Sequence, residues 1–379
     1  MKGVQLMQLF RMLVVQCLLF VTLISGSESG YIEVIRLIPV SQDGKWGYID
    51  ASGKLVIAFQ FDRVDFFAGD LAGVKMKEKW GFIDQKGKLA IEPQFDFVHP
   101  FKESLALVWV GGEQGKTGWV GGEYQYIDKT GKAVIIGDFD LADDFAEGMA
   151  RIWKDGRCGY MNKKGEVVIR PQYTFGGVFS EGVACIWVGE AYTADELIGE
   201  EIAEYYDEYD SIYVSYDGEQ IEWPVGKFGF IDKTGEMVVP PEFDFAGHFS
   251  EGVVNVKIAE KWEYIDKNGA VVVSVECDEA LPFSDNLAQI SIGNRWGYID
   301  KRGNKIIKEK FQTCGPFIHG LARVQIDGKW GYINKLGKFV IEPKYNMAED
   351  ARGGLLHVLE GKDWYYLNAQ GQLIWPRKP

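Results

Sequence analysis

The sequence predicts an all-β protein, because a 34-residue pattern with strand and turn signals recurs along most of the chain. Two observations carry this prediction: an anchor residue, usually aromatic, marks each unit, and a glycine always follows it seven residues later. The anchors, whose tryptophans we take as structural residues of the repeat, are Trp46, Trp80, Tyr124, Cys158, Phe228, Trp262, Trp296, Trp330 and Trp364. The glycines are Gly53, Gly87, Gly131, Gly165, Gly235, Gly269, Gly303, Gly337 and Gly371.

The unit around Trp330 indicates how each repeat folds. Leu321–Ile326 alternates inward apolar residues with others, which is typical of a strand with one buried face. Asp327-Gly328 is a two-residue hairpin signal, so the second strand is expected over Lys329–Asn334. A second turn leads to a third strand over Lys338–Ile341. Each unit is therefore expected to be a three-stranded antiparallel meander.

The turn after the second strand has the same chemistry in all nine units. Its first residue is always aspartate or asparagine: Asp50, Asp84, Asp128, Asn162, Asp232, Asp266, Asp300, Asn334 and Asn368. A short polar side chain accepts hydrogen bonds from the turn backbone, and glycine takes a positive φ without steric cost. The turn thus explains these residues without a catalytic or calcium-binding role.

Two further positions predict how the units pack on each other. One holds phenylalanine in seven units: Phe67, Phe101, Phe145, Phe179, Phe249, Phe283 and Phe317. The other is the glycine directly after the anchor in six units: Gly47, Gly81, Gly159, Gly229, Gly297 and Gly331. A strand glycine often marks the close approach of another segment, so we expect an aromatic side chain of a neighbouring unit over it.

Nine such units, from about Tyr31 to Trp375, are expected to form a solenoid-like array. The unit is shorter than the roughly 40–45 residues of a four-stranded propeller blade. The chain also begins and ends at the same phase of the repeat, so no strand from one end completes the unit at the other. A closed, propeller-like ring is the alternative.

The run Gly44–Ile57 reads Gly-Lys-Trp-Gly-Tyr-Ile-Asp-x-x-Gly-Lys-x-Val-Ile and returns at Gly328–Ile341, with asparagine for the aspartate. It resembles the WG repeat, also called the KWG repeat, and the resemblance covers about residues 35–375. Two units depart from it, with Tyr124-Gln125 and Cys158-Gly159 at the Trp-Gly position. The family is mostly bacterial and often exported, and the resemblance implies a β-rich interaction scaffold without catalytic residues.

Two anchor intervals exceed the period, by ten residues (44 instead of 34) and by thirty-six (70 instead of 34). Both insertions, at about 109–123 and 187–227, fall in the hairpin between the first and second strands. Insertions in repeat proteins map to loops on one face, which is often the binding face. The first contains Trp-Val-Gly-Gly-Glu twice, and the second is acidic and rich in tyrosine.

A row of tryptophans beside these insertions supplies candidate binding residues. The position twenty-nine residues after the anchor holds Trp109, Trp153 and Trp187 in three consecutive units. It faces away from the inward residues of the first strand, so an exposed ladder is a possible platform for a sugar chain or peptide. Insertions that fold back and bury the ladder are the alternative. The candidates from within the insertions are Trp119, Tyr205 and Tyr206.

The formal net charge is −14, which argues against nucleic acid or an anionic bilayer as the main partner. Residues 1–27 are expected to be a cleaved signal peptide, because the basic residues Lys2 and Arg11 precede the apolar run Met12–Ile24 and small residues follow it. An uncleaved anchor is the alternative, although the run is short for a bilayer span. Residues 28–379 are then the repeat array, with no membrane span after cleavage.

The remaining cysteines are Cys158, Cys185, Cys277 and Cys314. Their spacing fits no common zinc site, so we expect buried thiols, with disulfide pairing as the alternative. The sequence contains no nucleophile motif, zinc-binding histidine pair or dinucleotide fingerprint, so we expect no metal, no cofactor and no enzymatic activity. The expected function is a secreted, periplasmic or cell-surface scaffold for protein partners. Carbohydrate or cell-wall binding through the tryptophan ladder is the second hypothesis, and an envelope hydrolase is the third.

Overall fold

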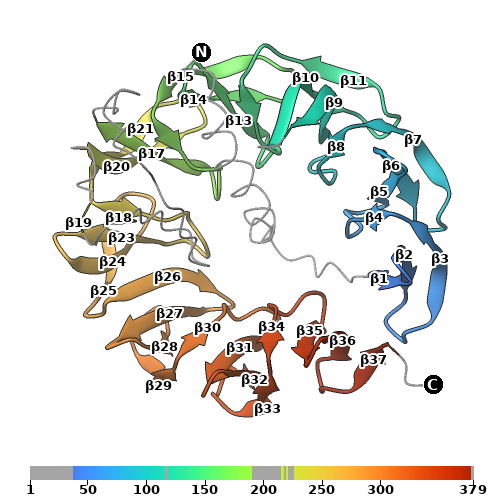
Figure 1. Cartoon of the computed structure of the whole chain (residues 1–379). Coiled ribbons are helices and arrows are strands. Elements are labelled where there is room, and N and C mark those ends of the chain that lie inside the picture. Colours follow the sequence, from blue (N-terminus) through green and yellow to red (C-terminus); the bar gives the residue numbers. More distant parts are fainter. Residues whose placement is uncertain (1–36, 116–117, 190–214, 217–218, 221–225, 377–379) are drawn as a thin grey trace.

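The computed structural model of the chain describes residues 37–115, 118–189, 215–216, 219–220 and 226–376. These residues form nine antiparallel sheets that lie side by side in a ring (Figure 1). Every regular element in this part of the chain is a strand. The protein is therefore a nine-bladed β-propeller, and the all-β prediction is confirmed. The described part contains no helix with the length and hydropathy needed to cross a bilayer.

We number the blades along the chain and give the strands of each in chain order, which runs from the inner to the outer edge (Figure 1). Blades 1 to 3 consist of β1 (Ile38–Gln42), β2 (Lys45–Ile49) and β3 (Leu55–Phe61); β4 (Arg63–Val64), β5 (Leu71–Met76), β6 (Lys79–Asp84) and β7 (Leu89–Phe95); and β8 (Phe97–Val98), β9 (Ala106–Gly115), β10 (Gly118–Ile127) and β11 (Ala133–Ile136). Blades 4 to 6 consist of β12 (Leu141–Ala142), β13 (Met149–Lys154), β14 (Arg157–Asn162) and β15 (Val167–Tyr173); β16 (Phe175–Gly176), β17 (Val183–Gly189), β20 (Gly226–Asp232) and β21 (Met237–Phe243); and β22 (Phe245–Ala246), β23 (Val254–Ile258), β24 (Lys261–Ile265) and β25 (Val271–Val275). Blades 7 to 9 consist of β26 (Glu279–Ser284), β27 (Leu287–Ile292), β28 (Arg295–Ile299) and β29 (Lys305–Phe311); β30 (Thr313–Cys314), β31 (Leu321–Ile326), β32 (Lys329–Asn334) and β33 (Phe339–Tyr345); and β34 (Met347–Ala348), β35 (Leu355–Glu360), β36 (Asp363–Asn368) and β37 (Leu373–Trp375). A separate pair, β18 (Ser215–Tyr216) and β19 (Glu219–Gln220), lies between β17 and β20 in the sequence.

Two predictions about the architecture are wrong: the solenoid and the three-stranded unit. Eight of the nine sheets have a fourth, inner strand, and in seven of them this strand is only two residues long. It forms where the connector pairs with the first strand of the next blade, as Arg63 does with Lys75. Because the inner strand uses so few residues, 34 residues suffice for a four-stranded blade. The length of the repeat therefore did not exclude a propeller.

The ring closes between blade 9 and blade 1 through side chains. An apolar cluster fills this joint: Ile38, Val40, Ile49, Leu355 and Ile374. The rings of Phe59 and Trp375 lie across it with their centroids 6.0 Å apart. Within the described residues, no strand of blade 1 pairs with a strand of blade 9. The two chain ends begin and stop at the same phase of the repeat, and from this we expected an open array. The ring can nevertheless close, because side chains and not a shared strand join blade 9 to blade 1.

The second turn of each unit folds as its chemistry predicts. In blade 8, Asn334 Oδ1 accepts hydrogen bonds from the backbone N–H groups of Leu336 (3.0 Å) and Lys338 (3.1 Å). The same pair of bonds forms at the aspartate or asparagine of the other eight units. Gly337 has a φ of 71°, and a Cβ added there would lie 3.3 Å from Ile307 of blade 7. The turn glycines therefore also allow neighbouring blades to pack closely.

The glycine directly after the anchor contacts its own third strand, so the expected aromatic neighbour over this position is wrong. A Cβ added to Gly331 would overlap the carbonyl oxygen of Ile341 in β33. Trp330 pairs with Tyr345 and Tyr332 pairs with Ile341, so β33 contains a bulge of two extra residues here. Glycine is needed because the bulged backbone crosses directly over it.

The core between blades is aromatic, as predicted. A fully buried tyrosine or phenylalanine follows the anchor by two residues in the first eight blades: Tyr48, Phe82, Tyr126, Tyr160, Phe230, Tyr264, Tyr298 and Tyr332. The ring of Tyr298 lies 4.7 Å from that of Phe317 in the next blade, and its hydroxyl donates to the Gly315 carbonyl oxygen at 2.8 Å. Each joint thus combines large buried rings with a satisfied polar group.

The predicted structural tryptophans belong to this core in most units. Trp80, Trp262, Trp296 and Trp330 are each 7–8% exposed. Trp46, in the first blade, is half-buried, whereas Trp364, in the last blade, is 38% exposed. The anchor tryptophans are therefore less buried in the first and last blades than in blades 2, 6, 7 and 8.

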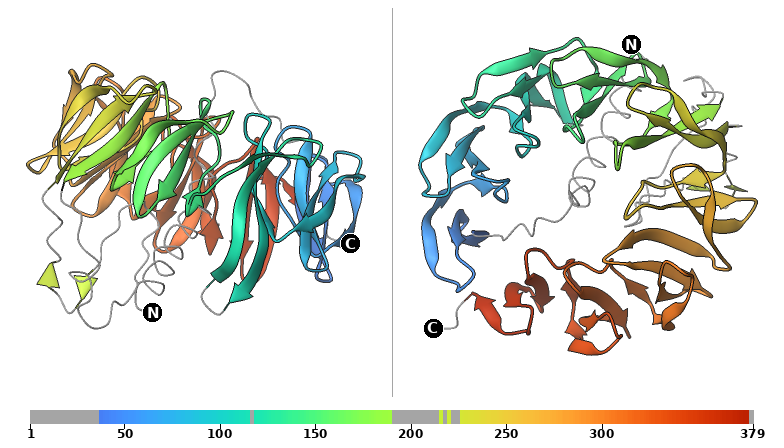
Figure 2. Two further views of the ribbon diagram at one scale, coloured as in Figure 1. Left: turned by 90° about the horizontal axis from the view of Figure 1, so that it is seen from above. Right: turned by 180° about the vertical axis from the view of Figure 1, so that it is seen from behind.

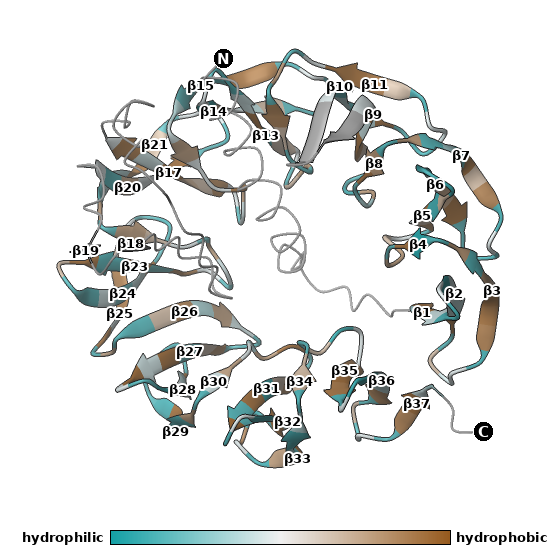
Figure 3. Cartoon of the chain, in the orientation of Figure 1, coloured by the Kyte–Doolittle hydropathy of each residue, from teal (hydrophilic) through white to brown (hydrophobic). Residues whose placement is uncertain are grey.

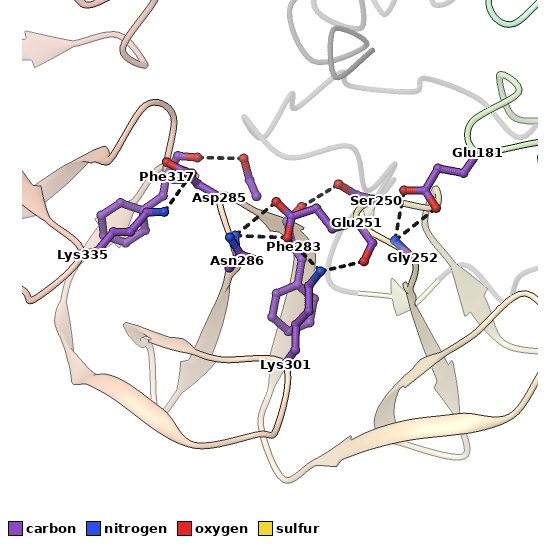
Figure 4. A network of polar contacts seen from close by, with 11 residues as sticks. Glu181, Ser250, Glu251, Gly252, Phe283, Asp285, Asn286, Lys301, Phe317 and Lys335 are labelled. Carbon is purple, nitrogen blue, oxygen red and sulfur yellow. Dashed lines mark hydrogen bonds and ion pairs between the residues drawn. The ribbon is translucent and has the colours of Figure 1, made fainter. Parts of the chain in front are cut away.

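Polar bridges also join consecutive blades from blade 3 to blade 8, and Figure 4 shows those between blades 5 and 8. In each bridge a carboxylate of one blade accepts a hydrogen bond from a backbone N–H of the next, as Glu251 does from Asn286 at 3.1 Å. The same carboxylate pairs with a lysine of that next blade, here Lys301 at 3.2 Å. The carboxylates are Glu103, Glu147, Glu181, Glu251 and Asp285.

The outer strands expose apolar residues at the rim of the ring. Figure 3 shows hydrophobic segments on β3 and β11. The exposed apolar residues of these and other third strands include Leu55, Val56, Val134, Ile136, Val167, Val168, Met237, Val238, Val271 and Val272. The rim is therefore a surface with apolar character.

The four cysteines that the structure describes form no disulfide with one another. Cys158, Cys185 and Cys314 are buried, and Cys277 is half-buried. Burial raises the pKa of Cys314 to about 12, which keeps this thiol protonated and unreactive near neutral pH. The expectation of buried thiols is confirmed for the three buried residues.

Candidate functional site

Blade 3 departs from the repeat directly after its anchor, where Gln125 replaces glycine. Gln125 pairs with Ile136, and β11 ends at that residue after four residues. In the corresponding register of blade 8, the third strand continues to Tyr345 and pairs with the anchor. A side chain at this position prevents the close crossing seen over Gly331. Among the described residues, the pairing of β11 with β10 ends at Ile136, and the chain that follows leaves the sheet.

The other blades support this explanation. All six blades with glycine after the anchor contain the bulge of two extra residues in the third strand. Blades 6 and 9 have Glu263 and Tyr365 at this position, and the described register of their third strands lacks that bulge. The residue after the anchor thus determines how the third strand crosses.

A pocket of about 380 Å³ opens where β11 leaves the sheet. It is lined by Trp109, Gly122, Glu123, Tyr124, Ile136, Gly137, Asp138, Phe139 and Asp140. Its volume lies near the lower end of the roughly 300–1,000 Å³ that is typical of ligand pockets. The pocket therefore suits a single side chain or another small group.

The inner wall of the pocket is an aromatic pair. The centroids of the Trp109 and Tyr124 rings lie 4.3 Å apart, with the planes at 76°. Trp109 is 7% exposed, and its indole Nε1 has no hydrogen-bond acceptor among the described residues. A Cβ added to Gly112 would overlap this nitrogen and one added to Gly122 would lie 2.7 Å from it, so the two glycines of the hairpin pack directly against the indole. The indole N–H is thus a buried donor next to the pocket.

The mouth of the pocket is acidic. Asp138 has a 96% exposed side chain and pairs with Lys154 at 2.6 Å. This hydrogen bond raises the pKa of Lys154. Asp140 accepts a hydrogen bond from the Asp155 backbone N–H at 2.8 Å, and Glu123 accepts one from Gln125 Nε2 at 2.6 Å. Two of the three pocket carboxylates, Asp138 and Asp140, therefore lie near Lys154.

The predicted tryptophan ladder does not form an exposed platform. Trp109 and Trp153 are 7% and 8% exposed, and Trp187 is half-buried. Trp153 lies between two strands of its own sheet, opposite Cys158 of β14 and Leu141 of the inner strand β12. The inner strand was not predicted from sequence, and its presence explains why this face of the first strand is covered. Of the two alternatives for the ladder, burial holds for Trp109 and Trp153.

The other candidate binding residues lie in the insertions. The backbone of Trp119 belongs to β10 and pairs with Gln114 of β9. Both strands of this hairpin are ten residues long, so the first insertion extends an existing hairpin. Tyr205 and Tyr206 lie outside the described residues. The structure thus places Trp109 at the pocket, whereas Trp153 and Trp187, the other described members of the ladder, do not line it.

A second group of ionisable side chains is buried beside the inner strands β8 and β12. His99 Nδ1 lies 3.0 Å from Asp144 Oδ1, and Arg151 forms an ion pair with Asp143. Burial alone would lower the pKa of His99, but the nearby carboxylates, chiefly Asp144, outweigh burial and raise it. Burial raises the pKa of Asp143 and raises that of Asp65 to about 6. Buried groups whose pKa values are shifted from their usual range thus lie at the joint between blades 3 and 4.

Sequence reasoning missed Glu123, Asp138 and Phe139 as pocket residues. The available signal was the pair Tyr124-Gln125, which was recognised as a departure from Trp-Gly but not connected to the third strand. Chemically, the pocket offers aromatic walls, one N–H donor and carboxylate acceptors, which together suit recognition of a ligand. Within the described part of the chain, no three histidine, cysteine or acidic residues are grouped to hold a metal ion.

Comparisons with solved structures agree with the ring architecture. A crystal structure of a eukaryotic initiation factor superposes with a TM-score of 0.56 and 9% sequence identity, over 88% of this chain and 93% of that chain. AztD from Citrobacter koseri gives a TM-score of 0.36 and 13% identity, over 89% and 92% of the two chains. Hsv2p from Kluyveromyces lactis gives 0.38 and 7%, over 82% and 96%. Of the three, only the initiation factor has a TM-score above 0.5, and at 9% identity its likeness concerns the fold alone.

No curated protein matches the sequence. The sequence profile of the WG containing repeat matches eight segments: 46–80, 80–112, 126–158, 159–188, 228–262, 264–296, 296–330 and 330–364. These segments span most of the described propeller and begin at or near the anchors. The chain therefore belongs to the WG-repeat family.

Proposed function

We propose that this protein is an exported, non-enzymatic scaffold that binds a protein partner at the cell envelope. The observation that carries the proposal is the position of its two insertions. The β9–β10 hairpin of blade 3 and the segment between β17 and β20 of blade 5 both join the first long strand of a blade to the second. The long hairpin and the β18–β19 pair extend to the same side of the ring (Figure 2, left). Loops held on one face of a rigid frame are a common arrangement for binding.

The frame suits this role because each blade is fixed to the next. The aromatic joints, exemplified by Tyr298 and Phe317, and the polar bridges, exemplified by Glu251 and Lys301, resist movement of one blade against another. The partner would therefore meet loops whose relative positions change little on binding. The apolar rim offers further surface for contact.

The proposed location depends on residues 1–27, whose charge and hydropathy are those of a signal peptide. Cell fractionation of the native host, followed by N-terminal sequencing of the recovered protein, tests this part. We expect the mature chain in the envelope or medium, beginning near Glu28. Full-length protein in the cytosolic fraction would contradict it.

The binding role is tested by capturing partners from an envelope extract with three proteins. The first is the intact mature chain, the second has residues 111–122 replaced by an Asp-Gly turn like that of blade 8, and the third lacks residues 190–225. We expect a defined set of proteins to be captured by the intact chain and lost from at least one variant. A fourth protein with Leu336→Ser, on an exposed turn of blade 8, is the matched control and should retain the partners. Identical capture by all four would contradict the proposal.

A further inference from the structure

We infer that the blade 3 pocket receives a lysine or arginine side chain from a peptide segment of the partner. The inference deepens the proposed function and rests on it, because it assigns a ligand class to one place on the scaffold. Three independent features support it: the charge at the mouth, the rings of the walls and the buried indole donor.

The charge at the mouth favours a cation. Glu123, Asp138 and Asp140 provide three carboxylates, and Lys154 is the basic residue paired with one of them. The Asp138 side chain is 96% exposed, so its ion pair with Lys154 is screened by solvent and adds little stability. An incoming cation can therefore share or displace Lys154 at low cost. The net charge of −14 also favours the approach of basic segments at a distance.

The walls favour a cation on an apolar stem. Tyr124 and Phe139 are half-buried, so each offers part of its ring to the pocket. Lysine and arginine bury their methylene groups against apolar surface while their charged ends remain near carboxylates or solvent. A cation within about 6 Å of an aromatic centroid also gains from the ring quadrupole. A bare metal ion would gain little from such walls.

The Trp109 indole distinguishes a peptide from a free amine. Its Nε1 donor is buried beside the pocket without an acceptor, and a buried donor is costly until it is paired. A peptide supplies a backbone carbonyl next to its basic side chain, so one residue provides both the acceptor and the cation. A simple alkylamine supplies only the cation.

The test uses short capped peptides and the indole NMR signal of Trp109. The probes are acetyl-Gly-Arg-Gly-amide and its neutral counterpart acetyl-Gly-Gln-Gly-amide, titrated into the full mature chain labelled with ¹⁵N. Trp109→Phe assigns the indole signal. We expect a saturable shift of this signal with the arginine peptide and little response to the glutamine peptide, to butylamine or to an oligomer of N-acetylglucosamine.

The matched variants separate local recognition from net charge. Glu123→Gln with Asp138→Asn should weaken binding of the arginine peptide about tenfold, since two carboxylate partners of the cation are lost. Asp43→Asn with Glu360→Gln removes the same charge at exposed positions outside the pocket and should leave affinity nearly unchanged. Unfolding curves of both double variants establish that they fold.

Equal affinity in the two double variants, or an equal shift with the glutamine peptide, would overturn the inference. Saturable binding of the sugar oligomer at Trp109 without a response to the arginine peptide would overturn it in favour of a glycan site. If the arginine peptide fails while the envelope extract still yields partners, the pocket assignment falls and the scaffold function stands. Binding of the peptide without any captured partner would reject the scaffold function but retain the pocket.

Discussion

Blades 3 and 8 follow the same plan, yet one contains a pocket and the other is closed. In blade 8, Gly331 allows β33 to cross over the second strand and return to the anchor Trp330. In blade 3, Gln125 occupies the equivalent position, β11 stops at Ile136, and the pocket opens beyond it. Loss of the glycine is accompanied by loss of the bulge in the third strand, as it also is in blade 6, where β25 nevertheless stays paired up to Val275 opposite the anchor Trp262.

The comparison separates the frame from the site. The second turn, the buried aromatic ring and the bridge to the next blade are present in blade 3 as in the regular blades. What differs is confined to the hairpin and to the end of the third strand. Blade 3 thus contains a pocket while its buried ring and its bridge to the next blade keep their regular contacts, and the pocket residues Tyr124 and Phe139 themselves pack against the cluster shared with blade 4.

The largest loss of stability is expected from a side chain at the glycine after the anchor of a regular blade. Gly331→Ala places a Cβ against the carbonyl oxygen of Ile341, where only backbone movement relieves the overlap. We expect a loss of about 2–3 kcal/mol in the free energy of unfolding, as for overpacked sites. Denaturant unfolding followed by tryptophan fluorescence measures it.

Glu263→Ala in blade 6 is the matched control, since that blade already carries a side chain at this position and lacks the bulge of two extra residues. Its unfolding midpoint should stay close to that of the wild type. Similar losses in both variants would mean that the position is intolerant for another reason, and the explanation of the pocket would lose its basis.

A smaller loss is expected from Tyr332→Phe in blade 8. Its hydroxyl donates to the Glu349 carbonyl oxygen of blade 9 at 2.7 Å, and removing it leaves that acceptor without this donor. We expect about 1 kcal/mol. Phe82 and Phe230 fill the same position in blades 2 and 5, so the ring alone is compatible with the fold. Tyr365→Phe, at a half-buried ring in blade 9, controls for the loss of a hydroxyl, and an equal effect there would contradict the assignment.

Features that recur locally in every unit, such as the second turn, could be predicted from the sequence. Features that depend on pairing between strands, such as the inner strands, could not. The second turn was predictable because its two ingredients, as in Asn334 and Gly337, are local and chemically specific. The inner strands were not, because a two-residue pair such as Thr313–Cys314 carries no periodicity and exists only when the next strand is beside it. Without those strands, the length of the unit argued against a propeller and the ladder position of Trp153 appeared exposed.

The pocket was unpredictable for a related reason. The importance of Gln125 depends on the backbone of β11, and nothing in the local sequence states that the third strand crosses at that point. In the structure, the six blades with glycine after the anchor have a bulge of two extra residues in the third strand. The described register of the other three blades lacks that bulge. The sequence therefore carried the signal, but only the register of the strands gave it meaning.

The pH dependence of stability distinguishes the joint at blade 3 from the regular joints. The pKa of His99 is raised in the folded state, because Asp144 and its neighbours outweigh burial, so the folded state binds a proton more tightly than the unfolded state. This contribution is complete below the unfolded pKa of about 6.5 and is lost as the pH rises through the higher folded value. The raised pKa of Asp65, about 6, acts in the same direction between about pH 4 and pH 6.

We therefore expect the melting temperature to fall between about pH 6 and pH 8, by less than the effect of Tyr332→Phe, and the slope to diminish in His99→Gln. His319→Gln, in blade 8, is the control and should preserve the slope. A rising melting temperature over this interval, or an unchanged slope in His99→Gln, would contradict the account of the cluster.

The smallest effect is expected from restoring the glycine in blade 3. Gln125→Gly removes the side chain that blocks the crossing, but the crossing segment also differs, with Gly137 and Asp138 where blade 8 has Pro343 and Lys344. Glycine is then necessary for the bulge without being sufficient, and the variant should lose roughly 0.5 kcal/mol from the added freedom of the unfolded chain. The Trp109 indole signal and the response to the arginine peptide should persist. A gain in stability together with loss of that response would mean that β11 had crossed and filled the pocket, and a single residue would then control whether a blade of this propeller is open or closed.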